Sequence, residues 1–147
     1  MSARLRIAAL VALAALAACS HSPPATPAGF TRVNKTTWVR GSGAAQQRYV
    51  VNTTPFLGSM KLLVSQATMN VVLKHPGARF LSSVPIADCP AMAGIATYRL
   101  PNAILEEAFS VQDGNAITID YTRPLDKPAD PSVLTAMAHE LCRAPGL

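Results

Sequence analysis

The most reactive side chains in this sequence are three cysteines and three histidines. His139 and Cys142 have an i, i+3 spacing, which on a helix would bring an imidazole to a thiol that it could activate. A zinc-protease helix needs a second histidine four residues after His139, and that position holds Arg143. No Cys-x-x-Cys spacing is present, which disfavours a redox site. His75 is expected at a helix end and His21 in an extended segment, so neither predicts a metal site.

Two other patterns that could carry catalysis are incomplete. Ser42 is flanked by Gly41 and Gly43, which is a short flexible turn and not the Gly-x-Ser-x-Gly elbow of a serine hydrolase. Glu106 and Glu107 are consecutive, so on a strand they point to opposite faces and do not form a carboxylate pair with each other. No glycine-rich phosphate loop is present. We therefore expect a protein that is not an enzyme and that uses no cofactor or metal.

The first 18 residues have the layout of an export signal. Arg4 and Arg6 give a positive start, and an apolar run of about 12 residues follows from Ile7 to Ala18. A helix needs about 20 residues to cross a bilayer, so this run is too short for a spanning anchor. Small residues before Cys19 complete the pattern of a signal peptide.

The segment Leu16-Ala17-Ala18-Cys19 resembles the lipobox of bacterial lipoproteins. The resemblance implies diacylglycerol transfer to the Cys19 thiol, cleavage before Cys19 and acylation of its new amino group, so that a lipid such as palmitate holds the chain at a membrane. The alternative is an ordinary secretory signal with an Ala-x-Ala-like site. Ser20 replaces the Asp that favours inner-membrane retention in enterobacterial lipoproteins. For a source with two membranes, the resemblance thus implies the periplasmic face of the outer membrane.

If Cys19 carries lipid, Cys89 and Cys142 remain as an even pair. Export would take them to an oxidising compartment, where a structural disulfide is the usual outcome. The bond would close a loop of about 50 residues and would stabilise the fold by about 4 kcal/mol. The alternatives are two unpaired thiols or a redox site.

Charge is distributed unevenly along the chain. No Asp or Glu occurs from residue 20 to 87, and all eight acidic residues follow. Such asymmetry can mark an anionic partner: phospholipid head groups, lipopolysaccharide phosphates or an acidic protein. Nucleic acid is not expected for an exported protein. The candidate contacts are Arg32, Lys35, Arg40 and Arg48. The alternative is that the two halves neutralise each other in the fold.

The sequence predicts one globular domain behind a tether. We assign residues 1–18 to the signal peptide, 19–35 to the lipidated cysteine and a proline-rich tether, and 36–147 to a single α+β domain. The tether contains Pro23, Pro24 and Pro27 with small residues between them. Its extended reach would be about 30 Å.

Periodicity predicts two helices and a largely antiparallel sheet. The first helix, from 59 to 75, begins at the capping residue Ser59 and ends at Pro76-Gly77. A second helix from 132 to 143 is predicted to begin at the capping residue Ser132. Asp113-Gly114 is a strong hairpin signal within a predicted meander. The expected strands are 36–40, 46–53, 79–86, 95–100, 103–111 and 116–123.

The first helix carries an apolar stripe that predicts close packing on the sheet. Its members recur at helical spacing, and the stripe is wide enough to suggest that both Met60 and Met69 fill the core. The stripe consists of Met60, Leu63, Val64, Ala67 and Val71, widened by Leu62, Met69 and Val72. In the second helix, the residues expected to face inward are Val133, Leu134, Met137 and Leu141.

The expected fold class is α+β, with two main helices packed against an antiparallel sheet. The order of elements resembles the PsbP-like fold of photosystem assembly proteins and some bacterial lipoproteins. The resemblance rests on Trp38 in an early strand, the helix end at His75-Pro76-Gly77, the strand 103–111, the turn Asp113-Gly114-Asn115-Ala116 leading into Ile119-Asp120-Tyr121-Thr122, and the closing helix. It implies a sandwich that serves as an assembly factor or binding module and not as an enzyme.

Two functional hypotheses follow from these patterns. The first is a lipid-anchored envelope protein that binds another macromolecule or supports the assembly of a complex. The second is a binder of a small or lipidic ligand in a groove between sheet and helix, favoured by a core with few aromatic residues and by Met60, Met69, Met92 and Met137. A packed interior without a groove would exclude the second hypothesis.

Overall fold

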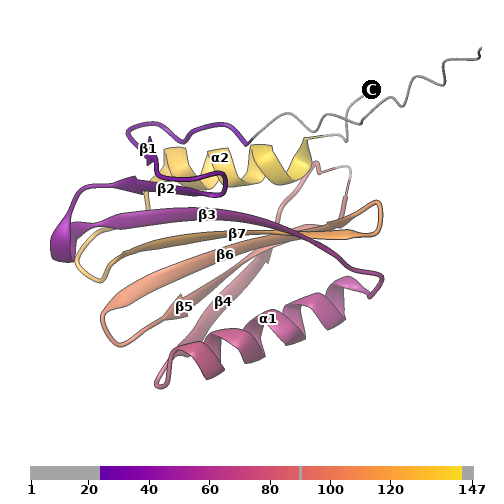
Figure 1. Cartoon of the computed structure of the whole chain (residues 1–147). Helices are drawn as coiled ribbons and strands as arrows, with labels where there is room; N and C mark the ends of the chain where they lie inside the picture. Colours follow the sequence, from indigo (N-terminus) through magenta and orange to yellow (C-terminus); the bar gives the residue numbers. More distant parts are fainter. Residues whose placement is uncertain (1–23, 90, 144–147) are drawn as a thin grey trace, which may run out of the picture.

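A seven-stranded antiparallel sheet with one helix on each face forms the fold (Figure 1). The computed structural model describes residues 24–89 and 91–143. The strand order is β1-β2-β3-β7-β6-β5-β4, and every neighbouring pair is antiparallel. The predicted α+β class is confirmed at this level. The elements are β1 (Thr31–Arg32), β2 (Thr37–Arg40), a short 3-10 turn η1 (Gly43–Ala45), β3 (Gln47–Pro55), α1 (Met60–Lys74), β4 (Arg79–Pro85), β5 (Ala93–Arg99), β6 (Ala103–Gln112), β7 (Asn115–Pro124) and α2 (Pro131–Cys142).

The turn between β6 and β7 sets the register of the central strands. Asp113 and Gly114 both have positive φ, +48° and +74°. Two consecutive residues of this kind form the two-residue hairpin turn whose twist matches that of the strands it joins. Gln112 therefore pairs with Asn115, and the ladder continues without a shift to Ala103 and Pro124.

The face of the sheet under α2 holds an aromatic-rich core. Trp38 and Tyr49 are cross-strand partners in β2 and β3, and their rings meet edge-to-face at 5.8 Å. Each of the two is more buried than its neighbours along its strand, because successive side chains point to opposite faces. The helix contributes Val133, Met137 and Leu141, which are fully buried against them.

The N-cap of helix α2 lies two residues earlier than predicted. Its N-cap is Asp130, whose carboxylate accepts hydrogen bonds from the Ser132 amide (3.0 Å) and the Ser132 hydroxyl (2.6 Å). The prediction of Ser132 as the cap was wrong because Pro131 suits the first helical position, where the missing N–H costs nothing. The preceding residue, Asp130, then supplies the capping carboxylate.

Much of the segment predicted as a tether packs against the domain. The Trp38 indole N–H donates a hydrogen bond to the Thr26 hydroxyl at 3.0 Å. Phe30 is buried beside Tyr49 and Tyr121, with ring centroids 6.1 and 6.3 Å away. The predicted boundary at residue 36 therefore falls too late, because an aromatic side chain within reach of a core is more stable inside it than in water.

The loop between β4 and β5 approaches the end of α2 at the two cysteines. The Sγ atoms of Cys89 and Cys142 lie 2.14 Å apart, with 4.8 Å between their Cα atoms. This geometry allows the predicted disulfide. The bond would fasten the last turn of α2 to the β4–β5 loop, at the edge of the sheet farthest from β1.

Candidate functional site

Helix α1 covers its face of the sheet with a narrow contact. Only Leu63, Ala67 and Val71 are buried. The wide stripe predicted from the sequence was wrong, since Leu62, Met69 and Val72 point away from the sheet. They are 46%, 63% and 49% exposed. A single helix contacts a sheet along one ridge, and no described element covers the opposite side of α1 (Figure 1).

One polar contact caps α1, and another joins it to the sheet. The Ser59 hydroxyl accepts a hydrogen bond from the Leu62 amide at 3.3 Å, which confirms the predicted cap. Further along the helix, the hydroxyls of Thr68 and Tyr98 are hydrogen-bonded at 2.9 Å. Tyr98 comes from β5, and Phe80 of β4 packs edge-to-face on its ring at 5.8 Å. The second half of α1 is thus joined to β5 and β4.

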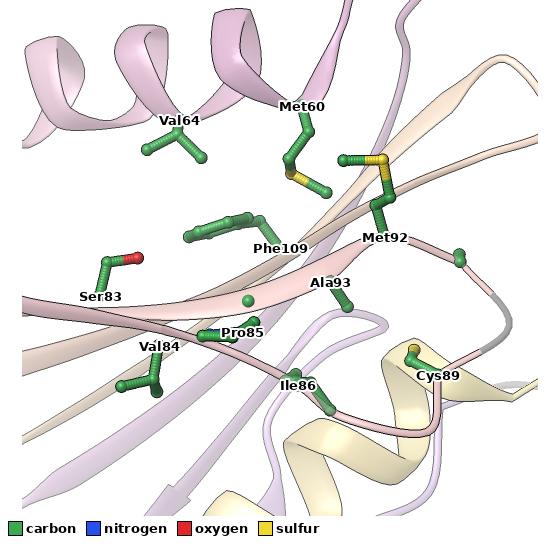
Figure 2. A pocket seen from close by; sticks show the side chains of 12 residues that line it. Met60, Val64, Ser83, Val84, Pro85, Ile86, Cys89, Met92, Ala93 and Phe109 are labelled. Carbon is green, nitrogen blue, oxygen red and sulfur yellow. The ribbon is translucent and has the colours of Figure 1, made fainter.

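The first half of α1 stands above an open apolar groove of about 580 Å³. In Figure 2, Met60 and Val64 point from the helix toward Phe109, and Met92 lies at one end. Among the described lining residues, Ser83 provides the only polar side chain that can hydrogen-bond. The lining residues are Met60, Val64, Ser83, Val84, Pro85, Ile86, Cys89, Ala91, Met92, Ala93, Gly94 and Phe109. The cavity has the size and apolar character of ligand pockets, which enclose about 300–1,000 Å³.

The absence of a side chain at Gly94 makes room for the Phe109 ring at the floor of the groove. A Cβ atom placed there would lie 3.1 Å from Cε2 of Phe109 and 3.2 Å from the Val84 carbonyl oxygen. The Phe109 ring therefore occupies the space above Gly94. Val84 and Ile86 line the part of the groove on the other side of the β4–β5 pair (Figure 2). The groove thus reaches around the free edge of the sheet.

Beside this groove, two acidic residues face each other under α1. Glu107 of β6 and Asp120 of β7 are direct cross-strand partners, so their side chains share a face. Glu107 is 8% exposed. Oε2 of Glu107 and Oδ1 of Asp120 are buried and have no hydrogen-bond partner among the described residues. Two carboxylates in this position repel each other when both are charged.

Burial and mutual repulsion favour a proton on this pair. Burial, followed by the charge of Asp120, raises the pKa of Glu107 to about 7, against a smaller lowering by Lys74. Burial also raises the pKa of Asp120, while the positive charges of Lys74, Arg48 and His75 lower it. The neutral form of Glu107 removes the repulsion between the two carboxyl groups. Within residues 24–89 and 91–143, no cluster of three or more His, Cys, Asp or Glu could hold a metal ion.

The sequence contains a signal for this pair that residue-by-residue reading missed. The predicted two-residue turn at Asp113-Gly114 makes Gln112 the partner of Asn115. Counting five residues away from the turn, toward the N-terminus in β6 and toward the C-terminus in β7, gives Glu107 and Asp120. The prediction that Glu106 and Glu107 point to opposite faces is confirmed. Glu106 lies on the α2 face, where it forms an ion pair with Arg123 at 3.0 Å.

The four candidate anion-binding residues do not form one surface. Arg40 is held by Asp130 at 2.8 Å and lies 4.7 Å from the centre of the Phe30 ring. Arg48 alternates with the buried Tyr49, so it lies on the other face of the sheet.

The remaining two candidates lie near the β1–β2 turn. The Arg32 guanidinium donates hydrogen bonds to the carbonyl oxygens of Asn34 (2.9 Å) and Lys35 (3.0 Å), and it stacks 5.5 Å from the centre of the Trp38 ring. Lys35 is exposed. The structure therefore separates the four cations between the two faces and a turn.

The histidine positions add no catalytic arrangement in the described part of the chain. His75 is the C-cap of α1, as predicted, and its amide donates a hydrogen bond to the Val71 carbonyl oxygen. His139 is exposed on α2, and the sulfur of Cys142 is directed to Cys89. Cys19 and His21 lie outside the described residues.

Comparisons with known proteins give no family assignment. No protein-family model matches the chain, and no curated protein is similar to it. In the described part of the chain, neither helix is long and apolar enough to span a membrane. The inference of function therefore depends on the groove, the carboxylate pair and the sequence motifs.

Proposed function

We propose that this protein is a lipid-anchored, non-catalytic binding module of the cell envelope, and that it holds an apolar ligand such as an acyl chain in the groove under α1. The observation that carries this proposal is the open cavity of about 580 Å³ between α1 and the β4–β5 edge. Its position matches the groove between sheet and helix expected for a ligand-binding member of this fold class. This makes ligand binding the better supported of the two functional hypotheses.

The side chains that line the groove determine which class of ligand it can hold. Among the described residues, no charged side chain lines the groove, and the Ser83 hydroxyl is the one polar side-chain group in the lining that can hydrogen-bond. Met60 and Met92 have flexible thioether side chains, which adapt to chains of different shape. An apolar chain would lose water on entry at a gain of about 25 cal/mol per Å² buried. A charged head group would have to stay outside, near the free edge of the sheet.

Binding of a fluorescent fatty acid tests this function. The full chain should bind 11-dansylaminoundecanoic acid with a blue shift in dansyl emission. Val64→Phe should abolish the shift, because Val64 points into the groove and a ring there would fill it (Figure 2). Val33→Phe is the matched control, since Val33 is exposed in the β1–β2 turn and far from the groove in sequence and strand order.

Three results would count against the acyl-chain ligand. These are a wild-type chain that gives no shift, a Val64→Phe chain that binds as well as wild type, or a Val33→Phe chain that loses binding equally. Circular dichroism of both variants would establish that each is folded before binding is compared. Palmitate added to the wild-type complex should displace the probe, which would show that the dansyl group is not the part recognised.

Localisation is tested separately through Cys19. We propose that Cys19 carries the lipid and that the protein resides at the periplasmic face of the outer membrane where the source has two membranes. Cys19→Ser should prevent lipid labelling and release the protein from membranes. A Cys19→Ser protein that remains labelled and membrane-bound would show that the lipobox interpretation is wrong.

The PsbP-like relationship remains part of this proposal. Supporting it are the antiparallel sheet, the two helices and the turn at Asp113-Gly114, which occur in the expected order. A role in assembling an envelope complex is the second candidate function, because the outer side of α1 exposes apolar side chains. Crosslinking in cells from Met69 on that side should then trap one specific protein and not a range of neighbours.

A further inference from the structure

We infer that two arginines and two hydroxyl groups on the α2 face of β4 and β5 form a binding site for a phosphate monoester. Arg79 of β4 and Arg99 of β5 are direct cross-strand partners, so their side chains share one face of the sheet. Ser82 and Thr97 are partners further along the same two strands. Because Thr97 and Arg99 are two residues apart in β5, both pairs lie on the same face.

Strand alternation identifies this face as the one on which α2 packs. Thr97 lies opposite Glu106 of β6, and Glu106 forms its ion pair with Arg123 on the α2 face. Ile104 of β6 is the partner of both Arg99 and Arg123, so these two arginines lie in one row across the sheet. The site is therefore separate from α1 and from the groove beneath it.

A register shift in β4 brings the serine hydroxyl to the arginines. The pairing moves by one residue between Phe80 and Ser82, which leaves Leu81 without a partner in β5. In a regular strand, residues three apart point to opposite faces, whereas the shift places Arg79 and Ser82 on the same face. Shifts of this kind occur at sheet edges, where they re-aim a side chain, and they are common beside functional sites.

Helix α2 leaves this part of its face uncovered. Its N-terminal end is joined to β2 through the ion pair of Asp130, and its last turn lies at the β4–β5 loop through Cys142. The helix therefore reaches β4 at the end of that strand, whereas Arg79 is its first residue. Arg79, Ser82 and Arg99 are accordingly exposed.

The four side chains of the site can all donate hydrogen bonds, and none of them is engaged. Neither Arg79 nor Arg99 forms an ion pair with a described residue, and neither hydroxyl has a hydrogen-bond partner among those residues. The carboxylate nearest in the register, that of Glu106, is held by Arg123 at 3.0 Å. Two like charges directly opposite each other destabilise a sheet, and an anion between them would relieve the repulsion.

The positive charge of this site matches a phosphate monoester. Two guanidinium groups carry two positive charges, and a phosphate monoester carries about 1.5 to 2 negative charges at pH 7. Guanidinium groups bind phosphate oxygens through forked pairs of hydrogen bonds, and the two hydroxyls can donate to the oxygens that remain. A carboxylate or a phosphodiester has a single negative charge and would leave one arginine without a counter-charge.

Arginine side-chain NMR signals test the site directly. In the full chain labelled with nitrogen-15, glycerol 3-phosphate at pH 7 should shift the Nε–Hε signals of Arg79 and Arg99 until they saturate. Dimethyl phosphate at the same ionic strength should bind several-fold more weakly, because it carries one negative charge. Equal shifts with both compounds would indicate only screening of charge and would overturn the inference.

Paired substitutions identify the groups that bind. Arg79→Gln combined with Arg99→Gln should weaken glycerol 3-phosphate binding, followed at the Thr97 amide signal, by about 100-fold, at about tenfold per charged donor lost. Lys35→Gln combined with Lys61→Gln makes the same change in net charge in the β1–β2 turn and on α1, and should leave binding within about twofold of wild type. Unchanged binding in the arginine variant, or an equal loss in the lysine variant, would overturn the inference.

Vesicles distinguish the two sources of a phosphate monoester. Competition with glycerol 3-phosphate by phosphatidylcholine vesicles that contain phosphatidic acid, and not by pure phosphatidylcholine vesicles, would assign the site to a lipid head group. Binding of glycerol 3-phosphate without such competition would assign it to a soluble phosphate monoester. None of these measurements depends on fatty-acid binding or on Cys19, so this inference and the proposed function can fail separately.

Discussion

On the α2 face of the sheet, Trp38, Val133 and Met137 have no exposed surface, and Glu106, Asp130 and Glu140 each form an ion pair with an arginine. On the α1 face, two acidic side chains face each other without a hydrogen-bond partner, and an apolar groove stays open beside them. The same sheet therefore carries a core with paired charges under α2 and buried carboxyl oxygens without hydrogen-bond partners under α1. The difference indicates that α2 stabilises the fold, whereas α1 covers the proposed binding groove.

Removing the Cys89–Cys142 link should lower the free energy of unfolding more than any of the changes below. It acts on the α2 face, because the link fastens the last turn of α2 to the β4–β5 loop. Cys89→Ser combined with Cys142→Ser would release a loop of 53 residues in the unfolded chain, at a cost of about 4 kcal/mol in the free energy of unfolding. Urea denaturation of the oxidised wild type and the double variant measures it. Equal midpoints would mean that the two cysteines are not bonded in the exported protein.

The two consecutive glutamates offer a sharper comparison, because one lies on each face. Glu106→Gln should destabilise the fold by about 3 kcal/mol, since Arg123 would keep a buried charge without its carboxylate. The Glu106→Leu, Arg123→Met double variant should recover most of that loss, because it removes both charges. A single variant as stable as wild type in urea would show that the ion pair is not needed on the α2 face.

The neighbouring change, Glu107→Gln, should have the opposite sign at high pH. Burial and the adjacent Asp120 raise the pKa of Glu107 to about 7 in the folded protein, from 4.5 for an ordinary glutamate. The folded state therefore binds the proton more tightly than the unfolded state does. The resulting stability is complete below about pH 4.5 and is lost as the pH rises through 7.

Glutamine has the shape of the neutral acid and cannot ionise, so Glu107→Gln should be neutral at pH 4. At pH 9 it should stabilise the fold by about 2 kcal/mol over wild type. Urea denaturation at a series of pH values would reveal the difference. Parallel stability curves for the two proteins across this range would contradict the raised pKa of Glu107. Glu106→Gln, measured at the same pH values, serves as the matched control on the other face.

The order and type of elements were largely predictable from the sequence, because turn and capping residues mark them. Ser59, Gly77 and the Asp113-Gly114 turn each indicate a boundary that the structure confirms. Where several residues compete for one position, the prediction was less accurate. Asp130 caps α2 in place of Ser132, since Pro131 can take the first position of the helix.

The candidate site was harder to predict, because it depends on which side chains remain uncovered. Helical spacing correctly grouped Leu63, Ala67 and Val71, but it could not show that Met69 would face away from the sheet. The pair of Glu107 and Asp120 could have been derived from the predicted turn by counting along both strands. The groove could not have been derived from the sequence in this way, since it depends on the distance between α1 and β4.

The smallest expected change in the free energy of unfolding is that of Leu73→Ala, which is compared with Leu63→Ala in the same helix. Leu73→Ala should change the free energy of unfolding by less than about 0.5 kcal/mol, because Leu73 is 72% exposed. Leu63→Ala should cost about 2 kcal/mol, because Leu63 is buried against the sheet. Urea denaturation of both variants measures the contrast. A large loss for Leu73→Ala would mean that the outer side of α1 is covered in the isolated protein.

The packing of Thr26 and Phe30 against the domain has a consequence for the affinity that the groove needs. It leaves a short connection to Cys19, so an acylated protein would be confined to a thin layer above its membrane. Within such a layer, tethered binding partners meet at effective concentrations in the millimolar range. A ligand in the same bilayer could then be captured at useful occupancy with only a modest dissociation constant, and release would be fast because weak complexes dissociate quickly.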